Sequence, residues 1–508
     1  MKCLSKLQVE KNESVRAAVP DANCFQLPER VLQFGTGILL RGVPDYFIDK
    51  ANKQGVFNGR IAVVTSIPGA NELNKQDGMF CHLIRGVMQS KVVDEVVVNT
   101  SISRVLVAND QWNDILEIAA SPDLDIIISN TTEVGITLFD EQISENPPHS
   151  FPGKLLSILY KRYQTFGGDV SKGLVIIPTE LVANNGRLLQ TICLQLAEMN
   201  NLEPAFIHWL KQHNHFCDSM VDRIVQGQLS DTHQQLLNEK IGVTDRFAIF
   251  SEPYALWAIE VNNEAVKKRL DFAAVNSEIV LSPDIYKFGQ LKLHLLNGTH
   301  TFCCGVALLC GFETVKEALA DKDFYAFIHQ LVYDEIVPEI LSDEISAEDA
   351  AAFTAIVLDR ISNPFIDYYW YRTALNFSSK MRLRNLPVML SYTDRNGSAP
   401  QHMAMAFAAM LLYLRSSSEK NGKYYGDLAG KIYPIPDDKV PLLNTCWVNG
   451  NTKESVRRLL GESAVWGVDL NKLTGFTAAV TYWMHQFETQ NPREVLAAFI
   501  HDKKPMAL

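Results

Sequence analysis

Short β-branched segments alternate with helical segments through roughly the first 200 residues, and this alternation is the strongest constraint on the fold. Runs such as RIAVVTS (60–66) and DIIISN (125–130) have the length and composition of buried strands. The sequence predicts strands at 31–35, 60–66, 92–98, 125–130 and 173–180, and helices at 38–53, 110–120, 154–163 and 187–199. Strands that alternate with helices form βαβ units, so we expect a mostly parallel sheet.

The pattern changes near residue 283. Beyond it, long apolar-periodic segments follow one another with few β-branched runs, which predicts helices at 287–309, 323–341, 348–361 and 403–414. The polar stretch SSSEKNGKYYGD (416–427) is predicted to be a loop between helices. We therefore expect an α/β domain over residues 1–282, followed by an all-α domain over residues 283–508.

Composition and charge limit the partners of the chain. With 47 Lys+Arg and 58 Asp+Glu, the net charge is −11, which argues against binding to nucleic acid or to an anionic membrane. The longest apolar run, at 403–414, is too short to span a bilayer, and the N-terminal residues show no secretory signal. The nine cysteines contain no C-x-x-C pair, so free thiols and a cytoplasmic location are expected.

A glycine turn follows the first predicted strand. Gly35-Thr36-Gly37 lies between that strand and a helix, where a turn of this kind can approach the pyrophosphate of a dinucleotide, as in a Rossmann-like domain. The third glycine of the G-x-G-x-x-G pattern is replaced by Leu40. The second strand ends in Thr65-Ser66 without the acid that grips a ribose 2′-hydroxyl, so these residues leave NAD and NADP open.

The segment KLHLLNGTH (292–300) carries three polar side chains with useful chemistry. On an α-helix, Lys292, Asn297 and His300 fall within an arc of about 140° and could face one pocket. A desolvated lysine exchanges protons near neutral pH, an asparagine amide donates to a developing alkoxide, and a histidine can orient a carbonyl. The alternative is that Lys292 lies on a solvated face and the other two are ordinary polar residues.

Taken together, several segments resemble the mannitol dehydrogenase family of long-chain, zinc-independent polyol dehydrogenases and hexuronate reductases. The similar segments run in the same order over most of the chain: PERVLQFGTGILLRG, QDGMFCHLIRG, SNTTEVGI, PTELVANNG, FCDSMVDRI, LLNGTHT and RISNPFI. SNTTEVGI and the QDG…IRG pair are most similar to the branch that reduces tagaturonate to altronate. That branch implies NAD as cofactor, a small uronate or aldonate as substrate, and no metal.

The resemblance also implies roles for individual residues. Lys292 would be the general acid/base, Asn297 and Asn185 would stabilise the oxyanion, and His300 would hold the reacting oxygen; Asn184 is the alternative to Asn185. The implied cofactor-binding residues are Phe34, Gly35, Thr36, Gly37, Ile38, Leu39, Arg41, Asn130, Thr131 and Glu133.

The implied substrate-binding residues are Arg372, Lys380 and Arg85. If one helix carried Arg372 and Lys380, they would lie about 80° apart around its axis and about 12 Å along it. Arg85 could meet a cofactor phosphate or a substrate carboxylate, or could instead form a salt bridge at the domain interface. The site is expected in a cleft between the two halves.

The same residues are consistent with other functions. A related hexuronate reductase or a hexitol dehydrogenase would use the same chemistry, and a nucleotide-binding sensor would keep the fold without turnover. Lys292, Asn297 and His300 argue against a sensor, which needs no proton donor. His213 and His215 could be read as a metal pair, but lone histidines at this spacing are more often surface polar residues. The sequence leaves the oligomeric state open.

Overall fold

The computed structural model describes residues 3–6, 22–131, 135–227 and 229–501, which form two compact units. Unit 1 contains the described residues up to Gly86 together with Lys91–Tyr286. Unit 2 contains Val87–Ser90 and the described part of Lys287–Leu508.

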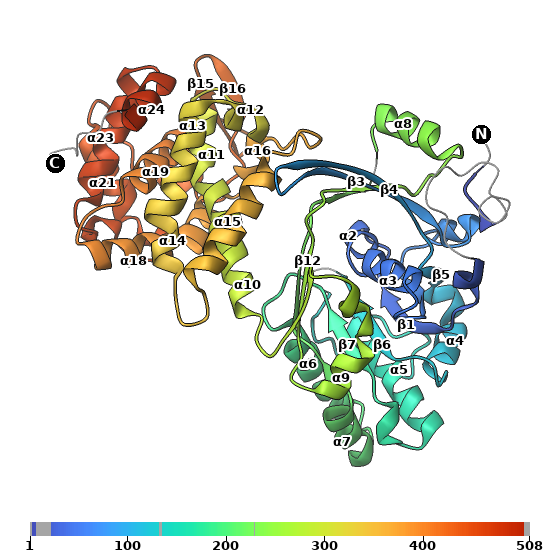
Figure 1. Ribbon diagram of the computed structural model, residues 1–508. Coiled ribbons are helices and arrows are strands. Elements are labelled where there is room, and N and C mark those ends of the chain that lie inside the picture. Colours follow the sequence, from blue (N-terminus) through green and yellow to red (C-terminus); the bar gives the residue numbers. More distant parts are fainter. Residues whose placement is uncertain (1–2, 7–21, 132–134, 228, 502–508) are drawn as a thin grey trace. The chain divides into compact units, whose positions relative to one another are not determined.

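Unit 1 is built on a six-stranded parallel sheet (Figure 1). The strands, in spatial order, are β5 (Ile102–Val107), β2 (Arg60–Thr65), β1 (Glu29–Phe34), β6 (Ile126–Ser129), β7 (Val175–Pro178) and β8 (His215–Phe216). Numbered within this sheet, the order is 3-2-1-4-5-6, which is that of the Rossmann fold. The direction of winding reverses between β1 and β6, so their carboxyl ends mark the expected ligand position.

Helices cover both faces of this sheet because its strand residues are apolar on both sides. On one face, Leu32 and Phe34 pack in a core with α4 (Ala108–Ala119), α5 (Phe151–Phe166), α6 (Asn185–Met199) and α7 (Pro204–His213). On the other face, Val31 and Val63 pack with α3 (Pro44–Lys53), η4 (Asp271–Val275) and α9 (Glu264–Arg269). The predicted Rossmann-like parallel sheet is confirmed.

The predicted helix over 38–53 is in fact two helices. α2 (Ile38–Gly42) ends at Val43, which has φ −123° and ψ −82°, and α3 begins at Pro44. The proline ring disfavours the helical conformation in the residue before it, so Val43-Pro44 separates the two helices.

The predicted strand at 92–98 exists but lies outside the parallel sheet. β4 (Lys91–Asn99) belongs to a four-stranded sheet of order β10-β11-β3-β4, with β10 (Val225–Gln226), β11 (Ile249–Ser251) and β3 (Phe80–Met88). A third sheet joins β13 (Ile279–Ser282), β12 (Leu256–Glu260) and β9 (Ser219–Asp222). The remaining elements of unit 1 are η1 (Ala22–Gln26), η2 (Glu72–Gln76), η3 (Val170–Lys172) and α8 (Asp231–Ile241).

Unit 2 is mostly helical, as predicted, and its long helices contain π-helical turns. The segment 286–309 runs as α10 (Tyr286–Leu291), π-helical η5 (Lys292–Gly298) and α11 (Thr299–Leu309). The same alternation occurs in α13 (Lys322–Gln330), η6 (Leu331–Ile336), α14 (Val337–Ile340) and in α17 (Phe377–Lys380), η7 (Met381–Asn385), α18 (Leu386–Asn396). The other helices are α12 (Val315–Ala320), α15 (Ala347–Ile361), α16 (Trp370–Thr373), α19 (Gln401–Tyr413), α20 (Val440–Asn444), α21 (Thr452–Gly461), α22 (Ser463–Trp466), η8 (Leu470–Lys472), α23 (Phe476–Thr489) and α24 (Pro492–His501).

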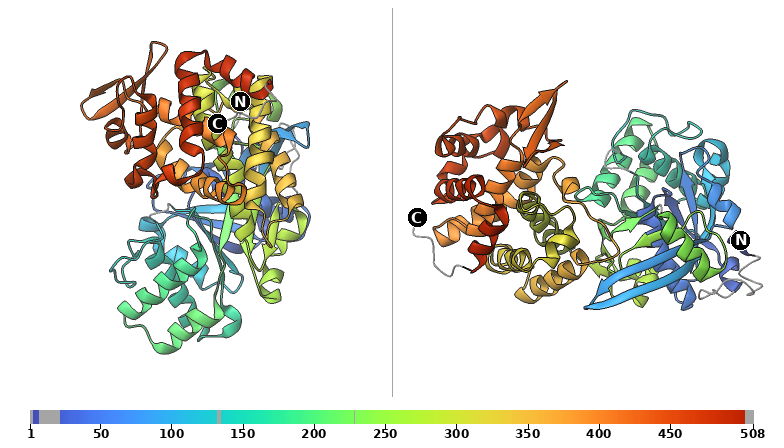
Figure 2. Two further views of the ribbon diagram at one scale, coloured as in Figure 1. Left: turned by 90° about the vertical axis from the view of Figure 1, so that its left-hand side faces the viewer. Right: turned by 90° about the horizontal axis from the view of Figure 1, so that it is seen from above.

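The predicted loop at 416–427 is wrong, because the chain there forms strands. β14 (Ser418–Lys420), β15 (Lys423–Leu428) and β16 (Lys431–Pro434) make an antiparallel sheet that projects from the helices of unit 2 (Figure 2). Asn421 and Gly422 both have positive φ, at 52° and 73°. This is the two-residue hairpin turn that an Asn-Gly pair favours, and the pair was the signal available in the sequence.

The longest apolar segment forms a buried helix. Every residue of α19 from Met403 to Leu411 is buried, which confirms that 403–414 belongs to a core. Among the helices that the structure describes, none combines the length and the apolarity needed to cross a bilayer. All nine cysteines are free thiols, as predicted, and seven of them are buried.

Candidate active site

The glycine turn lies at the point where the sheet reverses its winding. Gly35 directly follows β1, and Asn130 directly follows the neighbouring strand β6. Gly35 has φ +119°, and a Cβ there would be 2.8 Å from the Asn130 carbonyl oxygen. Both the backbone angle and this close approach require glycine, so Gly35 fixes the path of the turn.

Gly37 differs from Gly35, because its backbone conformation does not require glycine. It precedes α2 with φ −60° and ψ 151°, a conformation open to other residues. Among the described residues, a Cβ at Gly37 would meet only the side-chain oxygen of Asn130, at 4.0 Å. Glycine is therefore not required by the protein itself, and the missing side chain leaves room for a ligand beside the start of α2.

The two residues that follow β6 form hydrogen bonds with Thr179 and Glu180 of the segment PTELVANNG (178–186). The Asn130 side-chain amide donates to the Thr179 carbonyl and hydroxyl at 3.0 and 3.1 Å. The backbone N–H and hydroxyl of Thr131 donate to a Glu180 carboxylate oxygen at 2.8 and 3.0 Å. Glu133 lies outside the described residues.

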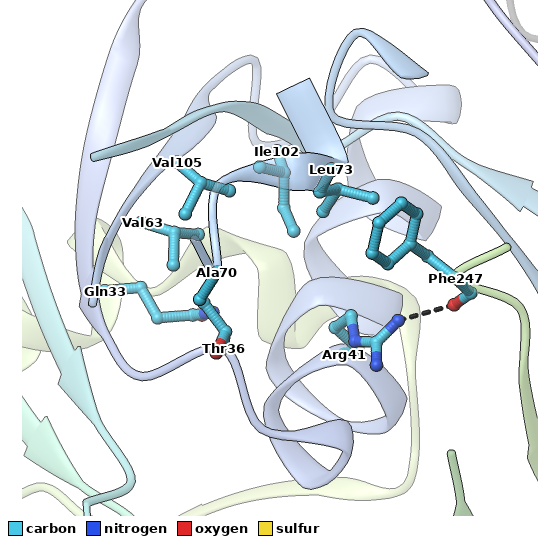
Figure 3. Close-up of a pocket in the computed structure, with 9 residues that line it drawn as sticks. All are labelled: Gln33, Thr36, Arg41, Val63, Ala70, Leu73, Ile102, Val105 and Phe247. Carbon is cyan, nitrogen blue, oxygen red and sulfur yellow. Dashed lines mark hydrogen bonds between the residues drawn. The ribbon is translucent and has the colours of Figure 1, made fainter. Parts of the chain in front are cut away.

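Beside the turn is a small cavity of about 230 Å³ (Figure 3). Its lining includes Gln33, Thr36, Arg41, Val63, Val105 and Phe247. The Arg41 guanidinium points toward Phe247 and donates to its carbonyl, and burial lowers the pKa of Arg41. The cavity is smaller than the ~300 Å³ lower limit of typical small-molecule pockets, so it can take at most part of a dinucleotide.

The other residues of the turn differ in how accessible they are to a ligand. The Phe34 ring packs against Phe151 with centroids 5.0 Å apart, which leaves only its backbone for a ligand. Ile38 and Leu39 are partly exposed at the start of α2. The strand order, the Gly35 turn and the open side of Gly37 fit a dinucleotide. Ser66, exposed after β2, supplies no acid for a ribose 2′-hydroxyl.

In unit 2, η5 changes the geometry expected for the lysine segment. Lys292 and Asn297 are the first and sixth residues of a continuous π-helical stretch. A π-helix joins residue i to residue i+5 by a hydrogen bond, so these two residues lie one turn apart on nearly the same face. On an α-helix they would be about 140° apart. The π-helical turn therefore aligns the lysine with the asparagine more closely than the sequence predicted.

His300 is held as a neutral imidazole with a defined tautomer. Its Nδ1 lies 2.8 Å from the Leu296 carbonyl oxygen, which can only accept, so Nδ1 carries the proton. Burial lowers the pKa of His300 to about 4, and the charges of Arg360 and Arg384 act in the same direction. The Tyr368 and Trp370 rings lie 5.8 and 6.1 Å from the imidazole. Nε2 therefore presents a lone pair and can accept a hydrogen bond from a hydroxyl.

A second π-helical turn, η7, packs along the first. The buried Asn385 amide donates to the Gly298 carbonyl at 3.0 Å, and the Arg384 carbonyl lies 3.1 Å from Nδ1 of His294. The Arg384 guanidinium donates to the hydroxyl of Thr301 at 3.3 Å. These contacts fix the segment that carries Lys292, Asn297 and His300. Sequence reasoning missed both Arg384 and Asn385.

Asn185 is fully engaged in hydrogen bonds. Its buried amide donates to the carbonyls of Pro178, Glu180 and Ser219 at 2.9–3.1 Å, and its oxygen accepts from the Gly186 and Ser219 N–H groups. In this conformation it has no hydrogen left for an oxyanion, so that role requires these bonds to rearrange.

Asn184, the alternative, is exposed in a left-handed conformation with φ 52°. Only its oxygen is engaged, by Arg187 at 3.4 Å, and its side-chain N–H groups make no hydrogen bond within the described part of the chain.

The three basic residues that the resemblance implies for substrate binding have different surroundings. The expectation of one helix for Arg372 and Lys380 is wrong, because Asn376 in a left-handed conformation separates α16 from α17. Arg372 is exposed and lies 5.9 and 6.0 Å from the rings of Tyr369 and Tyr371.

Lys380 is half-buried and donates to the Thr373 carbonyl at 3.0 Å. In unit 1, Arg85 of β3 pairs with Asp94 of β4 at 3.2 Å. Within the described ranges, no cluster of three or more His, Cys, Asp or Glu side chains could hold a metal ion.

A parallel doubly wound sheet with a glycine turn at its reversal point defines a nucleotide-binding domain of the Rossmann type. Residues 29–272 match the mannitol dehydrogenase Rossmann domain, and residues 284–488 match the mannitol dehydrogenase C-terminal domain. The chain belongs to the mannitol dehydrogenase family. It is a polyol or sugar-acid dehydrogenase that acts on CH–OH groups of small molecules.

Individual relatives and solved structures agree with this assignment. Two proteins named altronate oxidoreductase are similar: one of Halalkalibacterium halodurans, 38% identical over 88% of both chains, and one of Bacillus subtilis, 34% identical over 93% of this chain and 96% of that protein. Mannitol 2-dehydrogenase of Pseudomonas fluorescens, solved with NAD and D-mannitol, has a TM-score of 0.68 at 23% identity over 99% of this chain and 100% of that chain. A substrate-free D-sorbitol dehydrogenase has a TM-score of 0.76 at 17% identity over 98% and 100%. These two structures show the shared fold.

Proposed function

We propose that the chain catalyses the reversible, NAD-dependent reduction of D-tagaturonate to D-altronate. The observation that carries the proposal is its similarity, over 88% of the chain at 38% identity, to a protein named altronate oxidoreductase. The segments SNTTEVGI and QDG…IRG, which resemble the tagaturonate-reducing branch, support the same substrate.

The dinucleotide is assigned to unit 1. Gly35, Thr36 and Gly37 with the start of α2 would hold the pyrophosphate, Arg41 and Asn130 would border it, and Thr131 would continue the site beyond β6. The bound cofactor supplies the hydride that reduces the carbonyl carbon.

The proton chemistry is assigned to unit 2. Lys292 donates a proton to the carbonyl oxygen, and the amide of Asn297 donates a hydrogen bond to the same oxygen as charge develops on it. Within the described chain the Asn297 side chain makes no other hydrogen bond. His300, with its lone pair on Nε2, accepts a hydrogen bond from a substrate hydroxyl, including the one formed at the reacting carbon. Asn184, rather than Asn185, is the better-placed additional amide donor, because the Asn185 amide is already engaged by three carbonyls.

Steady-state assays of NADH oxidation with tagaturonate, fructuronate and fructose test the substrate. We expect the highest kcat/KM for tagaturonate, and a lower value for each of the others. A higher kcat/KM for fructuronate or fructose would instead assign the chain to fructuronate reduction or to a hexitol dehydrogenase. Repeating the tagaturonate assay with NADPH tests the cofactor, and a preference for NADPH contradicts the assignment of NAD.

A further inference from the structure

Two half-buried cations on one segment of unit 2 have no acidic partner among the described residues. Lys380 ends α17, and Arg384 lies four residues later within η7. The acceptors that they contact are neutral: the Thr373 carbonyl for Lys380 and the Thr301 hydroxyl for Arg384. Within the ranges that the structure describes, neither cation forms an ion pair with a carboxylate. We call these two residues the cation pair.

Two neighbouring cations without an anion between them destabilise the folded protein. Buried charges are ordinarily paired, and like charges four residues apart on a helix repel each other. Burial lowers the pKa values of both side chains, and the charge of Arg384 lowers the pKa of Lys380 further. The chain has 58 acidic and only 47 basic residues, so a shortage of carboxylates does not explain the missing partner. An anion bound from solution would relieve the repulsion.

The cation pair adjoins the proposed proton-transfer residues. Arg384 contacts Thr301, the residue after His300, and its charge contributes to the low pKa of His300. The neighbouring Asn385 is bonded to Gly298, the residue after Asn297. An anion held by Arg384 would therefore lie close to the face that carries the reacting carbonyl.

From this geometry we propose that Arg384, supported by Lys380, binds the carboxylate of the substrate and makes the enzyme selective for uronates over uncharged ketoses and polyols. Arg384 uses one nitrogen for Thr301, and its other N–H groups make no hydrogen bond to described residues. A guanidinium presents paired N–H groups that match the two oxygens of a carboxylate. The inference rests on the proposed function, since it assigns the charged end of that substrate.

The exposed Arg372 fits this role less well. Its guanidinium lies over the rings of Tyr369 and Tyr371, where solvent screens its charge. A carboxylate at Arg372 would stay largely hydrated and would contribute little selectivity. Arg384 is half-buried and has no acidic partner within the described ranges, so solvent screens its attraction to a carboxylate less than at Arg372.

The test compares Arg384→Met with Arg382→Met, a matched change of an exposed arginine two residues earlier. For Arg384→Met we expect KM for tagaturonate to rise by on the order of 10²-fold with a smaller change in kcat, because the lost contact acts in both the ground state and the transition state. KM for fructose should not rise, and Arg384→Lys should recover part of the lost affinity. Arg382→Met should behave as wild type, and thermal unfolding should show that each variant is folded.

The outcomes separate this inference from the proposed function. If the wild-type enzyme reduces tagaturonate and Arg384→Met keeps its KM within twofold, the inference is wrong while the function stands. An equal loss for fructose and tagaturonate also overturns it. If the wild-type enzyme does not reduce tagaturonate, the proposed function fails, and calorimetric binding of D-altronate to wild type and Arg384→Met decides the inference. Equal binding, or none to either protein, contradicts it.

Discussion

The two units position their functional residues by different means. In unit 1 the backbone conformation of one residue, Gly35 with φ +119°, sets the path of the glycine turn. In unit 2 the alignment of Lys292 with Asn297 depends on a π-helical turn, against which a second π-helical turn from about 90 residues later packs through Asn385. The turn proposed to bind the cofactor can therefore be encoded locally, whereas the face proposed for proton transfer depends on contacts between distant segments.

The largest expected effect tests the lysine of the π-helical turn. Lys292→Ala should lower kcat by about 10²–10⁴-fold, the usual contribution of a general acid/base, while NADH affinity, assigned to unit 1, stays unchanged. The matched control is Lys287→Ala, which removes a lysine of the preceding helix that pairs with Asp349 at 3.2 Å. A kcat near the wild-type value in Lys292→Ala would contradict the proposed mechanism and the division of labour between the units.

The pH dependence of stability tests His300. Burial lowers the pKa of His300 from the ordinary histidine value of 6.5 to about 4 in the folded protein, so the unfolded chain binds more protons between these pH values. Stability is therefore lost as the pH falls from about 6.5 to about 4, by about 3 kcal/mol at the lower end.

This loss should disappear in His300→Gln when the free energy of unfolding is measured in urea at several pH values. The exposed His485→Gln variant should retain it. Equal pH dependence in wild type and His300→Gln would mean that the imidazole is not held neutral.

Asn385→Ala tests whether packing between the two π-helical turns positions the active face. Losing its hydrogen bond to Gly298 leaves a buried carbonyl without that donor, which should cost about 1–3 kcal/mol of stability. If the contact also aligns Lys292 and Asn297, kcat should fall while NADH affinity holds. The control Asn396→Ala changes an exposed asparagine in α18 that bonds only within its own helix. A destabilised variant with unchanged kcat would limit Asn385 to a structural role.

The smallest expected effects separate the two glycines of unit 1. Gly35→Ala should destabilise the protein by about 1–3 kcal/mol, because φ +119° is strained for any residue with a side chain. Gly37→Val should unfold near the wild-type temperature yet bind NADH about tenfold more weakly, a loss of about 1.4 kcal/mol. Thermal unfolding of both variants measures the change in stability, and calorimetric titration measures the change in NADH affinity. Unchanged NADH affinity in Gly37→Val would mean that the turn does not contact the cofactor.

The sequence predicted unit 1 better than unit 2 in detail. Buried strands such as 60–66 and 125–130 are short, continuous and β-branched, so their positions and parallel pairing follow from the residues themselves. The sequence predicted one helix over 38–53, whereas Val43 before Pro44 divides that segment into two helices. It also predicted the strand β4 without indicating that β4 belongs to a different sheet. In unit 2 it identified the helices but missed the hairpin at Asn421-Gly422 and all three π-helical turns.

By itself, the sequence determined the two-part architecture, the position of the glycine turn and the resemblance that names Lys292, Asn297 and His300. These follow from periodicity, from residue types with special backbone freedom and from motif order, all of which are local properties. Only the tertiary structure decided that η5 is π-helical, that Asn185 is engaged by three carbonyls and that Lys380 and Arg384 have no acidic partner among the described residues. The physical reason is that a helix register, a hydrogen-bond partner and the absence of a counter-charge depend on residues far away in the chain, which no local pattern specifies.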